Sequence, residues 1–379
     1  MRIEDVRSHV SGAMHFVTVH TDTGLTGLGQ SGCWAYPTAV AAVTEVCRAA
    51  LIGQDPRNIE RHHQHLYRMG PFRGAVLSAA VSSIDIALWD LVAQHHEVPV
   101  YELLGGRYRK RVRLCSLLAE QTSLAGMIGS SNDAALRGYT AIKFDPLLPG
   151  YEKVSAARRH ADVLELVGEV RHAVGEDVDI ILELGRKLTP LEAGPMIEGL
   201  AQFKPLFIED PIQIDSIRIQ ADLAARTRVP LAAGERLHTV WEFAELLAHG
   251  GPQYLRPDPG LCGGFTGLRK IAALGEAHHS AVVTHNFLGP VLTAASVHFD
   301  IATPNILVQE YRESDENSEV HAALTSRLTR DGGFMNAPDG IGIGVILNPD
   351  HLNAETYDSL IRNVAAPRLR TDGSLANVV

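Results

Sequence analysis

Hydrophobic and polar positions change their spacing near residue 112, and this change divides the chain into two parts. In the first part, residues 1–10 and 14–20 predict two strands, and the turn at Thr21 to Gly24 leads into a third extended stretch at 25–30. Helical spacing of apolar residues follows at 37–52, 57–68 and 75–95. We therefore expect residues 1–111 to form an α+β domain.

Short apolar stretches alternate with longer helical patterns from residue 112 onward. The predicted strands are 112–119, 140–147, 178–185, 205–211, 230–236, 254–260, 281–286 and 305–311. Helical patterns lie between most of them, at 160–174, 190–203, 213–227, 239–249, 264–278 and 289–302. This alternation indicates parallel βαβ units, and eight of them fit an α/β fold of the (β/α)₈ (TIM) barrel type. An open, doubly wound sheet is the alternative. We assign 112–345 to the barrel and expect 346–379 to pack back on the N-terminal domain.

Composition narrows the class of partners. The 379 residues are 45 % hydrophobic and 21 % charged, as in an ordinary globular protein, and the net charge of −10 argues against nucleic acid or an anionic membrane as a partner. The four cysteines have no metal-binding spacing, and neither an apolar leader nor an apolar stretch of eighteen residues is present. We expect a cytoplasmic protein without a transmembrane helix.

Three carboxylates follow apolar strands one βα unit apart. Glu183, Glu209 and Glu235 are separated by 26 residues at each step. The C-terminal ends of barrel strands meet in one mouth, so these side chains should converge. Converging carboxylates repel and raise one another's pKa unless a cation is bound, and all-oxygen ligation favours Mg²⁺, with Mn²⁺ or Ca²⁺ as alternatives. The competing interpretation is that each acid caps a helix or forms an ion pair.

Four further polar residues lie near the ends of four of the other five predicted strands. Asp258 and His285 lie on consecutive strands, where a carboxylate can fix the imidazole tautomer and produce a general base. A structural histidine and a simple turn around Asp258 are the alternatives. Lys143 is expected to bind a substrate carboxylate or stabilise negative charge, and Glu310 to hydrogen-bond the substrate or donate to an enolate. Two alternatives stay open: Lys143 could be a solvated lysine at a strand end, and Glu310 could be a salt-bridged carboxylate at the rim.

Several short motifs together carry a resemblance that covers almost the whole chain. The sequence resembles the enolase superfamily, in its mandelate racemase-like subgroup. The matching phrases are SIDIALWD at 83–90, LGG at 104–106, GYTAIK at 138–143, FIEDP at 207–211, AGE at 233–235, Asp258 followed by Gly263 and Gly264, and His285 followed by Gly289 and Pro290.

This resemblance implies a modified (β/α)₈ barrel with an α+β capping domain. It implies Mg²⁺ on the three carboxylates, the Asp258–His285 pair as catalytic dyad, and removal of a proton α to a carboxylate to give an enediolate that the metal stabilises. A homo-oligomer, from dimer to octamer, is also implied.

Within the subgroup the chain is most similar to acid sugar dehydratases of the galactonate dehydratase type. The segment that ends at Arg73 is typical of these enzymes, and we expect Arg73 to bind substrate. Asp145 stands where racemases carry a second lysine, which favours elimination over racemisation and suggests a substrate contact. We expect His285 to take the C2 proton and a 3-hydroxyl to leave, which gives a 2-keto-3-deoxy acid.

The sequence departs from that pattern at two positions. Glu183 replaces the usual aspartate, and Gly185 stands where a histidine would protonate the leaving hydroxyl. Two other functions therefore stay open. One is an epimerase, racemase or cycloisomerase with the same enolate chemistry. The other is a metal-binding barrel without efficient catalysis.

Overall fold

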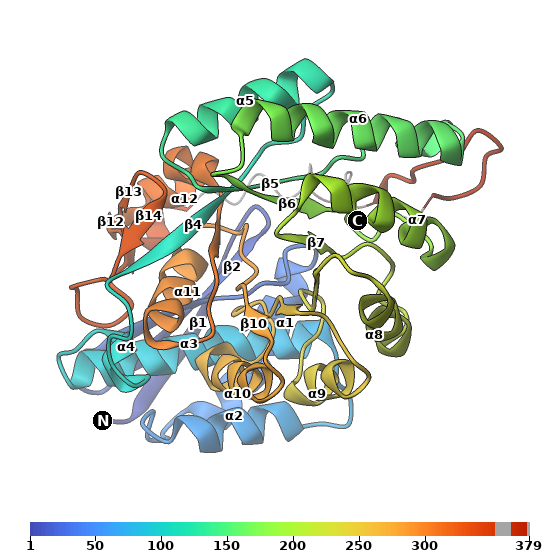
Figure 1. Ribbon diagram of the computed structural model, residues 1–379. Helices are drawn as coiled ribbons and strands as arrows, with labels where there is room; N and C mark the ends of the chain where they lie inside the picture. The colour runs from blue at the N-terminus through green and yellow to red at the C-terminus, as the bar shows by residue number, and fades with distance from the viewer. Residues whose placement is uncertain (353–364, 377–379) are drawn as a thin grey trace.

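The N-terminal part of the computed structural model is a three-stranded antiparallel sheet packed on helices. The structure describes residues 1–352 and 365–376. The sheet has the order β1-β2-β3, and the capping helices follow it directly (Figure 1). The elements are β1 (Ile3–Ser11), β2 (Met14–Thr21), β3 (Thr26–Gln30), α1 (Pro37–Leu51), α2 (Ile59–Arg68), α3 (Ala75–His95) and α4 (Val100–Leu103). These bounds agree closely with the predicted α+β domain.

Helix α3 is the core of this domain. Gly27 and Gly29 let strand β3 lie directly against it, because a Cβ at these positions would come within 2.1 Å of the Ala87 carbonyl and 1.9 Å of the Ser83 carbonyl. By length and composition α3 could cross a membrane, but 78 % of its apolar window is buried inside the protein. It is therefore packed as a core helix.

The second part is the predicted barrel. Eight strands run in parallel in chain order, β11 pairs with β4, and a bridge between Val282 and Ile306 links the β10 region to the segment before β11. The strands are β4 (Arg111–Leu117), β5 (Ala141–Phe144), β6 (Asp179–Glu183), β7 (Phe207–Glu209), β8 (Leu231–Ala233), β9 (Tyr254–Leu255), β10 (Ala281–Val282) and β11 (Gln309–Tyr311). Strands β8 to β10 are shorter than predicted, so several predicted site residues lie just beyond the last paired residue.

Helices cover the outside of these strands (Figure 1). Five of them begin at a serine or threonine whose side chain accepts a hydrogen bond from a backbone N–H of the first turn, which satisfies a donor that the helix leaves free. These are α5 (Leu124–Leu136), α6 (Ala156–Val174), α7 (Pro190–Leu200), α8 (Ile217–Arg226) and α9 (Val240–Ala248), and α10 (Gly264–Ala277) and α11 (Pro290–Ala302) complete the set. Short 3₁₀ turns η1 (Tyr151–Lys153) and η2 (Ala201–Phe203) lie among them.

Side chains from the strands fill the inside of the barrel. A separate apolar cluster there consists of Cys115, Ala141, Ile181, Phe207, Ala232, Val283 and Val308. Because side chains alternate along a strand, residues two positions beyond these point to the same side. Lys143, Glu183 and Glu209 are each two residues beyond a member of this cluster, which directs them into the mouth.

The chain after β11 returns to both parts. The remaining elements are η3 (Glu313–Asn317), α12 (Glu319–Ala322), β12 (Leu324–Ser326), β13 (Arg330–Asp331), β14 (Phe334–Asn336), β15 (Ile346–Leu347) and η4 (Pro349–His351). Strand β14 pairs antiparallel with β4, and the backbone N–H of Gly342 donates to Val98 and that of Ile343 to Asp90. The segment before residue 346 therefore already contacts the capping domain. The predicted boundaries stay a prediction, and 353–364 and 377–379 lie outside the described residues.

Candidate active site

Three carboxylates meet at the mouth as the spacing predicted. Strands β6 and β7 end at Glu183 and Glu209, which are register partners, and Glu235 lies two residues beyond β8. One oxygen from each of the three lies within 4.8 Å of the others. Glu209 and Glu235 are buried, and Glu183 is partly exposed.

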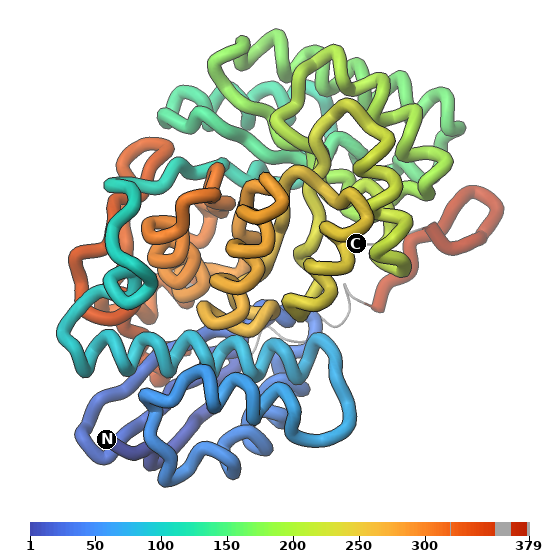
Figure 2. Tube along the Cα trace, turned by 60° about the horizontal axis from the view of Figure 1, so that its bottom comes forward, coloured from blue at the N-terminus to red at the C-terminus, as the bar shows by residue number. Residues whose placement is uncertain are grey.

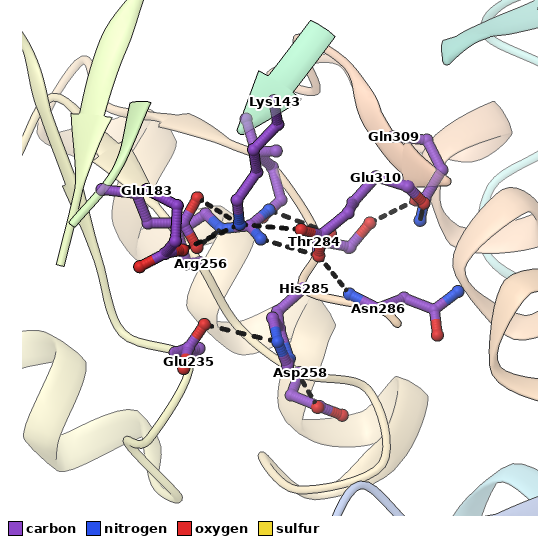
Figure 3. A network of polar contacts seen from close by, with 12 residues as sticks. Lys143, Glu183, Glu235, Arg256, Asp258, Thr284, His285, Asn286, Gln309 and Glu310 are labelled. Carbon is purple, nitrogen blue, oxygen red and sulfur yellow. Dashed lines mark hydrogen bonds and ion pairs between the residues drawn. The ribbon is translucent and has the colours of Figure 1, made fainter. Parts of the chain in front are cut away.

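Lys143 extends from β5 into this group of acids (Figure 3). Its Nζ lies 2.9 Å from Glu183 Oε2, 2.8 Å from Glu209 Oε2 and 2.8 Å from Glu310 Oε1. Burial alone would lower the pKa of Lys143, but the surrounding carboxylates raise it well above its usual value. The ammonium is therefore firmly charged and compensates three acids at once.

Two buried arginines complete the network, and the sequence reasoning missed both. Arg256 donates from Nε to Glu209 at 2.8 Å and from Nη2 to Glu310 at 2.8 Å. Arg186 donates from Nη1 to Glu235 at 2.5 Å and to Asp210 at 2.9 Å. The sequence did contain a signal for Arg256. It lies two residues before Asp258, and because side chains alternate along a strand, the two side chains are expected to point the same way, into the mouth.

Arg186 gave a weaker signal, because its direction depends on the backbone. Gly185 has φ +56° and Arg186 φ +60°, two successive left-handed residues that redirect the chain after Glu183. Gly185 also donates its backbone N–H to Glu183 Oε1 at 2.7 Å. This turn therefore orients both a carboxylate and the guanidinium that follows it.

Burial raises the pKa of some of the acids, and neighbouring cations lower the pKa of others. Burial raises the pKa of Glu209 to about 8, against the lowering effect of Arg256 and Lys143. The pKa of Asp210 is likewise raised by burial, to about 7. Burial would also raise the pKa of Glu235, but His285 and Arg186 outweigh it and hold that pKa well below its usual range. The positive charges of Arg256 and Lys143 therefore do not fully offset the cost of burying the Glu209 carboxylate.

The donor set fits a divalent cation. Oxygens within 4.8 Å of one another can share one ion, because ligand distances for Mg²⁺ and Ca²⁺ are roughly 2.0–2.6 Å. Carboxylates also outnumber cationic side chains by six to four among the described residues of the network, which suits an added double charge. The acids are Glu183, Glu209, Asp210, Glu235, Asp258 and Glu310, and the cations are Lys143, Arg186, Arg236 and Arg256.

His285 and Asp258 lie beside the carboxylates in the predicted pairing. His285 Nδ1 is 2.8 Å from Asp258 Oδ2, and Nε2 is 3.3 Å from Glu235 Oε2. Burial lowers the pKa of His285, but the charges of Glu235 and Asp258 outweigh this effect and raise the pKa above 6.5. The imidazole is therefore tethered at one nitrogen and presents the other to the acids.

The capping domain reaches this dyad through the loop after β3. A Cβ at Gly32 would lie 2.5 Å from Asp258 Oδ1, and the Gly32 N–H donates to the Gly260 carbonyl at 2.7 Å. Figure 2 shows the capping domain packed along the barrel, beside the segments that carry α9 to α11. Close approach of the two domains thus fixes the position of Asp258.

Two predicted substrate contacts have other partners in the structure. Asp145 is ion-paired with Lys187. Arg73 is exposed, donates to the carbonyls of Gly70 and Phe72, and lies over the Tyr67 ring. The structure does not bring Arg73 to the acids, so its role as a substrate contact stays a prediction without geometric support.

Known proteins match the chain over almost its full length. Residues 6–105 match the model for the N-terminal domain of mandelate racemase / muconate lactonizing enzyme, and 129–351 match the enolase C-terminal domain-like model. A D-galactonate dehydratase from Verminephrobacter eiseniae is 36 % identical over 343 residues, which is 88 % of each chain. One from Ralstonia nicotianae is 34 % identical over 340 residues, or 87 % of each chain.

Solved structures agree with these matches. An enolase from Agrobacterium radiobacter, a candidate galactarate dehydratase bound to sodium and L-malate, superposes with a TM-score of 0.91 at 28 % identity. The match covers 99 % of this chain and 100 % of that one.

Proposed function

The chain belongs to the mandelate racemase / muconate lactonizing enzyme family of the enolase superfamily and is a carbon–oxygen lyase, and we propose that it dehydrates an acid sugar to a 2-keto-3-deoxy acid with the help of Mg²⁺. The observation that carries this proposal is the His285–Asp258 pair placed beside three converging carboxylates at one barrel mouth. Assembly as a homo-oligomer stays a prediction.

His285 acts as the base in this proposal. Asp258 accepts a hydrogen bond from the Nδ1–H of His285, which leaves the Nε2 lone pair as the proton acceptor, and its negative charge stabilises the imidazolium that forms. Nε2 lies on the side of the ring that faces Glu235, so the C2–H bond of a substrate seated by the acids would meet it. The base is therefore positioned against a carbon next to the substrate carboxylate.

Glu183, Glu209 and Glu235 would hold the cation. When bound, a divalent ion supplies the charge stabilisation that a weak carbon acid needs. Lys143 adds a fixed positive charge from β5 on the same side of the mouth. Removal of the C2 proton develops negative charge on the substrate carboxylate, and this ammonium is a donor that can approach it.

Glu310 has a positioning role in this arrangement. Its oxygens accept from Lys143, from Arg256 and from the backbone N–H of Asn286 at 2.8 Å each. Burial raises the pKa of Glu310, but Arg256 and Lys143 outweigh this effect and lower it below its usual value. An ionised carboxylate accepts hydrogen bonds and has no proton to donate, so we assign to Glu310 the orientation of the two cations.

Incubation with a set of acid sugars in deuterated water tests the proposal. Purified protein with Mg²⁺ should form a 2-keto-3-deoxy acid from at least one sugar acid, detected as its semicarbazone. The variant His285→Asn should lose turnover while Mg²⁺ still raises its melting temperature, because Asn cannot act as the base. Lys204→Met, which alters an exposed ion pair with Glu176, is the matched control.

The same experiment separates the other two functions. Deuterium at C2 without dehydration would indicate an epimerase or racemase, and conversion of a lactone would indicate a cycloisomerase. Neither product nor exchange with any sugar would indicate a barrel without efficient catalysis and would overturn the proposal.

A further inference from the structure

An ion pair between the buried Lys187 and the partly exposed Asp145 joins the loop after β6 to the residue that follows β5, at the place where the expected general acid is absent. Gly185 offers no side chain for proton transfer, yet the departing hydroxyl of a dehydration needs a proton. We propose that Lys187, held by Asp145, protonates this leaving oxygen. The proposal rests on the dehydration proposed above and names a catalytic residue for it.

Strand register places Asp145 inside the mouth. Lys143 pairs with Ile181 and Phe144 with Leu182, and Asp145 is the first residue beyond this last pair on β5, as Glu183 is on β6. Extended by one residue past the end of β5, the alternation of side chains directs Asp145 to the same side as Lys143, one step farther out of the barrel. The ammonium of Lys187 binds this carboxylate and is therefore held at the mouth beside the group of acids.

The pair lies across the barrel from the base. Strands β6, β7, β8, β9 and β10 are consecutive neighbours in the sheet, so the loop after β6 and the loop after β10 are four strands apart. In a closed barrel of eight strands, four steps lead to the opposite wall. A substrate between them would meet His285 on one face and Lys187 on the other, as an elimination from opposite faces requires.

Lys187 is also the cation of this region that suits proton donation. Its side chain is only 4 % exposed, and Nζ lies 5.1 Å from the centre of the Tyr151 ring. Lys143 is surrounded by three carboxylates that hold its proton tightly. Arg186 has a guanidinium that does not give up its proton in proteins. Lys187 has one carboxylate partner among the described residues, and an ammonium, unlike a guanidinium, can act as a general acid.

The proposed step balances in protons and electrons. His285 Nε2 takes the C2 proton, and the C–H electron pair passes into the enediolate and then forms the C2–C3 double bond. The C3–O bond breaks, the oxygen keeps that electron pair, and Lys187 Nζ–H supplies the proton that makes it water. The resulting enol takes up a proton at C3 to become the 2-keto-3-deoxy acid. Lys187 is left neutral and regains its proton from solvent.

A fluorinated substrate isolates this role. Fluoride leaves without protonation, so a 3-deoxy-3-fluoro analogue of the acid sugar that the wild type dehydrates needs His285 but no acid. In Lys187→Met, kcat for dehydration should fall by about 10²–10⁴-fold, the usual contribution of a general acid, while fluoride release stays within about tenfold of wild type. His285→Asn should lose both reactions.

Two further variants protect the test against misfolding. Lys187→Arg keeps the charge beside Asp145 but cannot release a proton, so it should show the same selective loss of dehydration. Asp145→Asn should also impair dehydration more than fluoride release, because the aspartate positions Lys187. Lys204→Met serves as the surface control, and a Mg²⁺-dependent rise in melting temperature shows that each variant folds.

The possible results separate this inference from the proposed function. Equal dehydration by Lys187→Met and wild type would overturn the inference alone, and so would an equal loss of both eliminations, which would indicate substrate binding. Formation of the C2 epimer by wild type, lost in Lys187→Met, would make Lys187 a second base and would also overturn it. If the wild type eliminates neither water nor fluoride, the proposed function fails first.

Discussion

Replacement of Arg256 by methionine is a direct test of the buried charge network. The guanidinium is 1 % exposed, donates to Glu209 and Glu310 at 2.8 Å each, and donates to the carbonyls of Val283 and Thr284. Removal of one partner from a buried ion pair destabilises a protein by roughly 3–5 kcal/mol, because the remaining charge is left uncompensated. Lys143 still lies 2.8 Å from both carboxylates, so we expect the free energy of unfolding to fall by about 3 kcal/mol, the lower end of this range.

Urea unfolding at 25 °C with a chelator present measures this change without any contribution from bound metal. Circular dichroism and tryptophan fluorescence should give coincident transitions for each variant. Arg48→Met is the matched control, because Arg48 is 41 % exposed and solvent screens its pair with Asp5, so this pair should contribute little to stability. Adding Glu310→Gln to Arg256→Met should restore part of the loss. If Arg256→Met costs no more than Arg48→Met, the network does not stabilise the fold as argued.

Three other changes probe the dyad, the cation and a buried histidine. Gly32→Ala should lower kcat without loss of fold, because the new Cβ would come 2.5 Å from Asp258 Oδ1 and displace the partner of His285; an unchanged kcat would refute this contact. Mg²⁺ at about 100 times its Kd should stabilise the wild type by about 2.7 kcal/mol, and Glu235→Gln should weaken or abolish that gain in a thermal shift measurement. Burial lowers the pKa of His298 from 6.5 to about 4, so the folded state binds fewer protons than the unfolded state between these values and stability falls as pH drops through them. Between pH 7.5 and pH 5 the free energy of unfolding should fall by about 2 kcal/mol more for the wild type than for His298→Asn. An equal fall for the two proteins would show that this imidazole is not held neutral.

The carboxylates of the site could be predicted because they obey the barrel's repeat. Glu183, Glu209 and Glu235 follow apolar strands at equal spacing, and parallel strands must deliver their ends to the same mouth. His285 and Asp258 followed from the same rule, and their hydrogen bond is present. The fold was predicted for the same reason, since the alternation of strands and helices leaves few topologies.

Lys143 followed from the same rule, but the other cations of the site could not be predicted in this way. The direction of Arg186 depends on two left-handed residues after β6, and no periodic pattern encodes such a turn. The pairing of Lys187 with Asp145 joins the loop after β6 to the residue that follows β5, and it depends on that same turn. Arg73 was predicted from a resemblance of its segment alone, without a strand end to fix its place, and it lies outside the group of acids.

Anomalous diffraction from crystals grown with Mn²⁺ tests the central claim most directly, because Mn²⁺ accepts the same oxygen ligands as Mg²⁺ and can be located by its own scattering. The account predicts one peak that has an oxygen of Glu183, Glu209 and Glu235 each within roughly 2.0–2.6 Å. A peak bound elsewhere, or Lys143 still lying between Glu183 and Glu209 with no peak at saturating Mn²⁺, would contradict it.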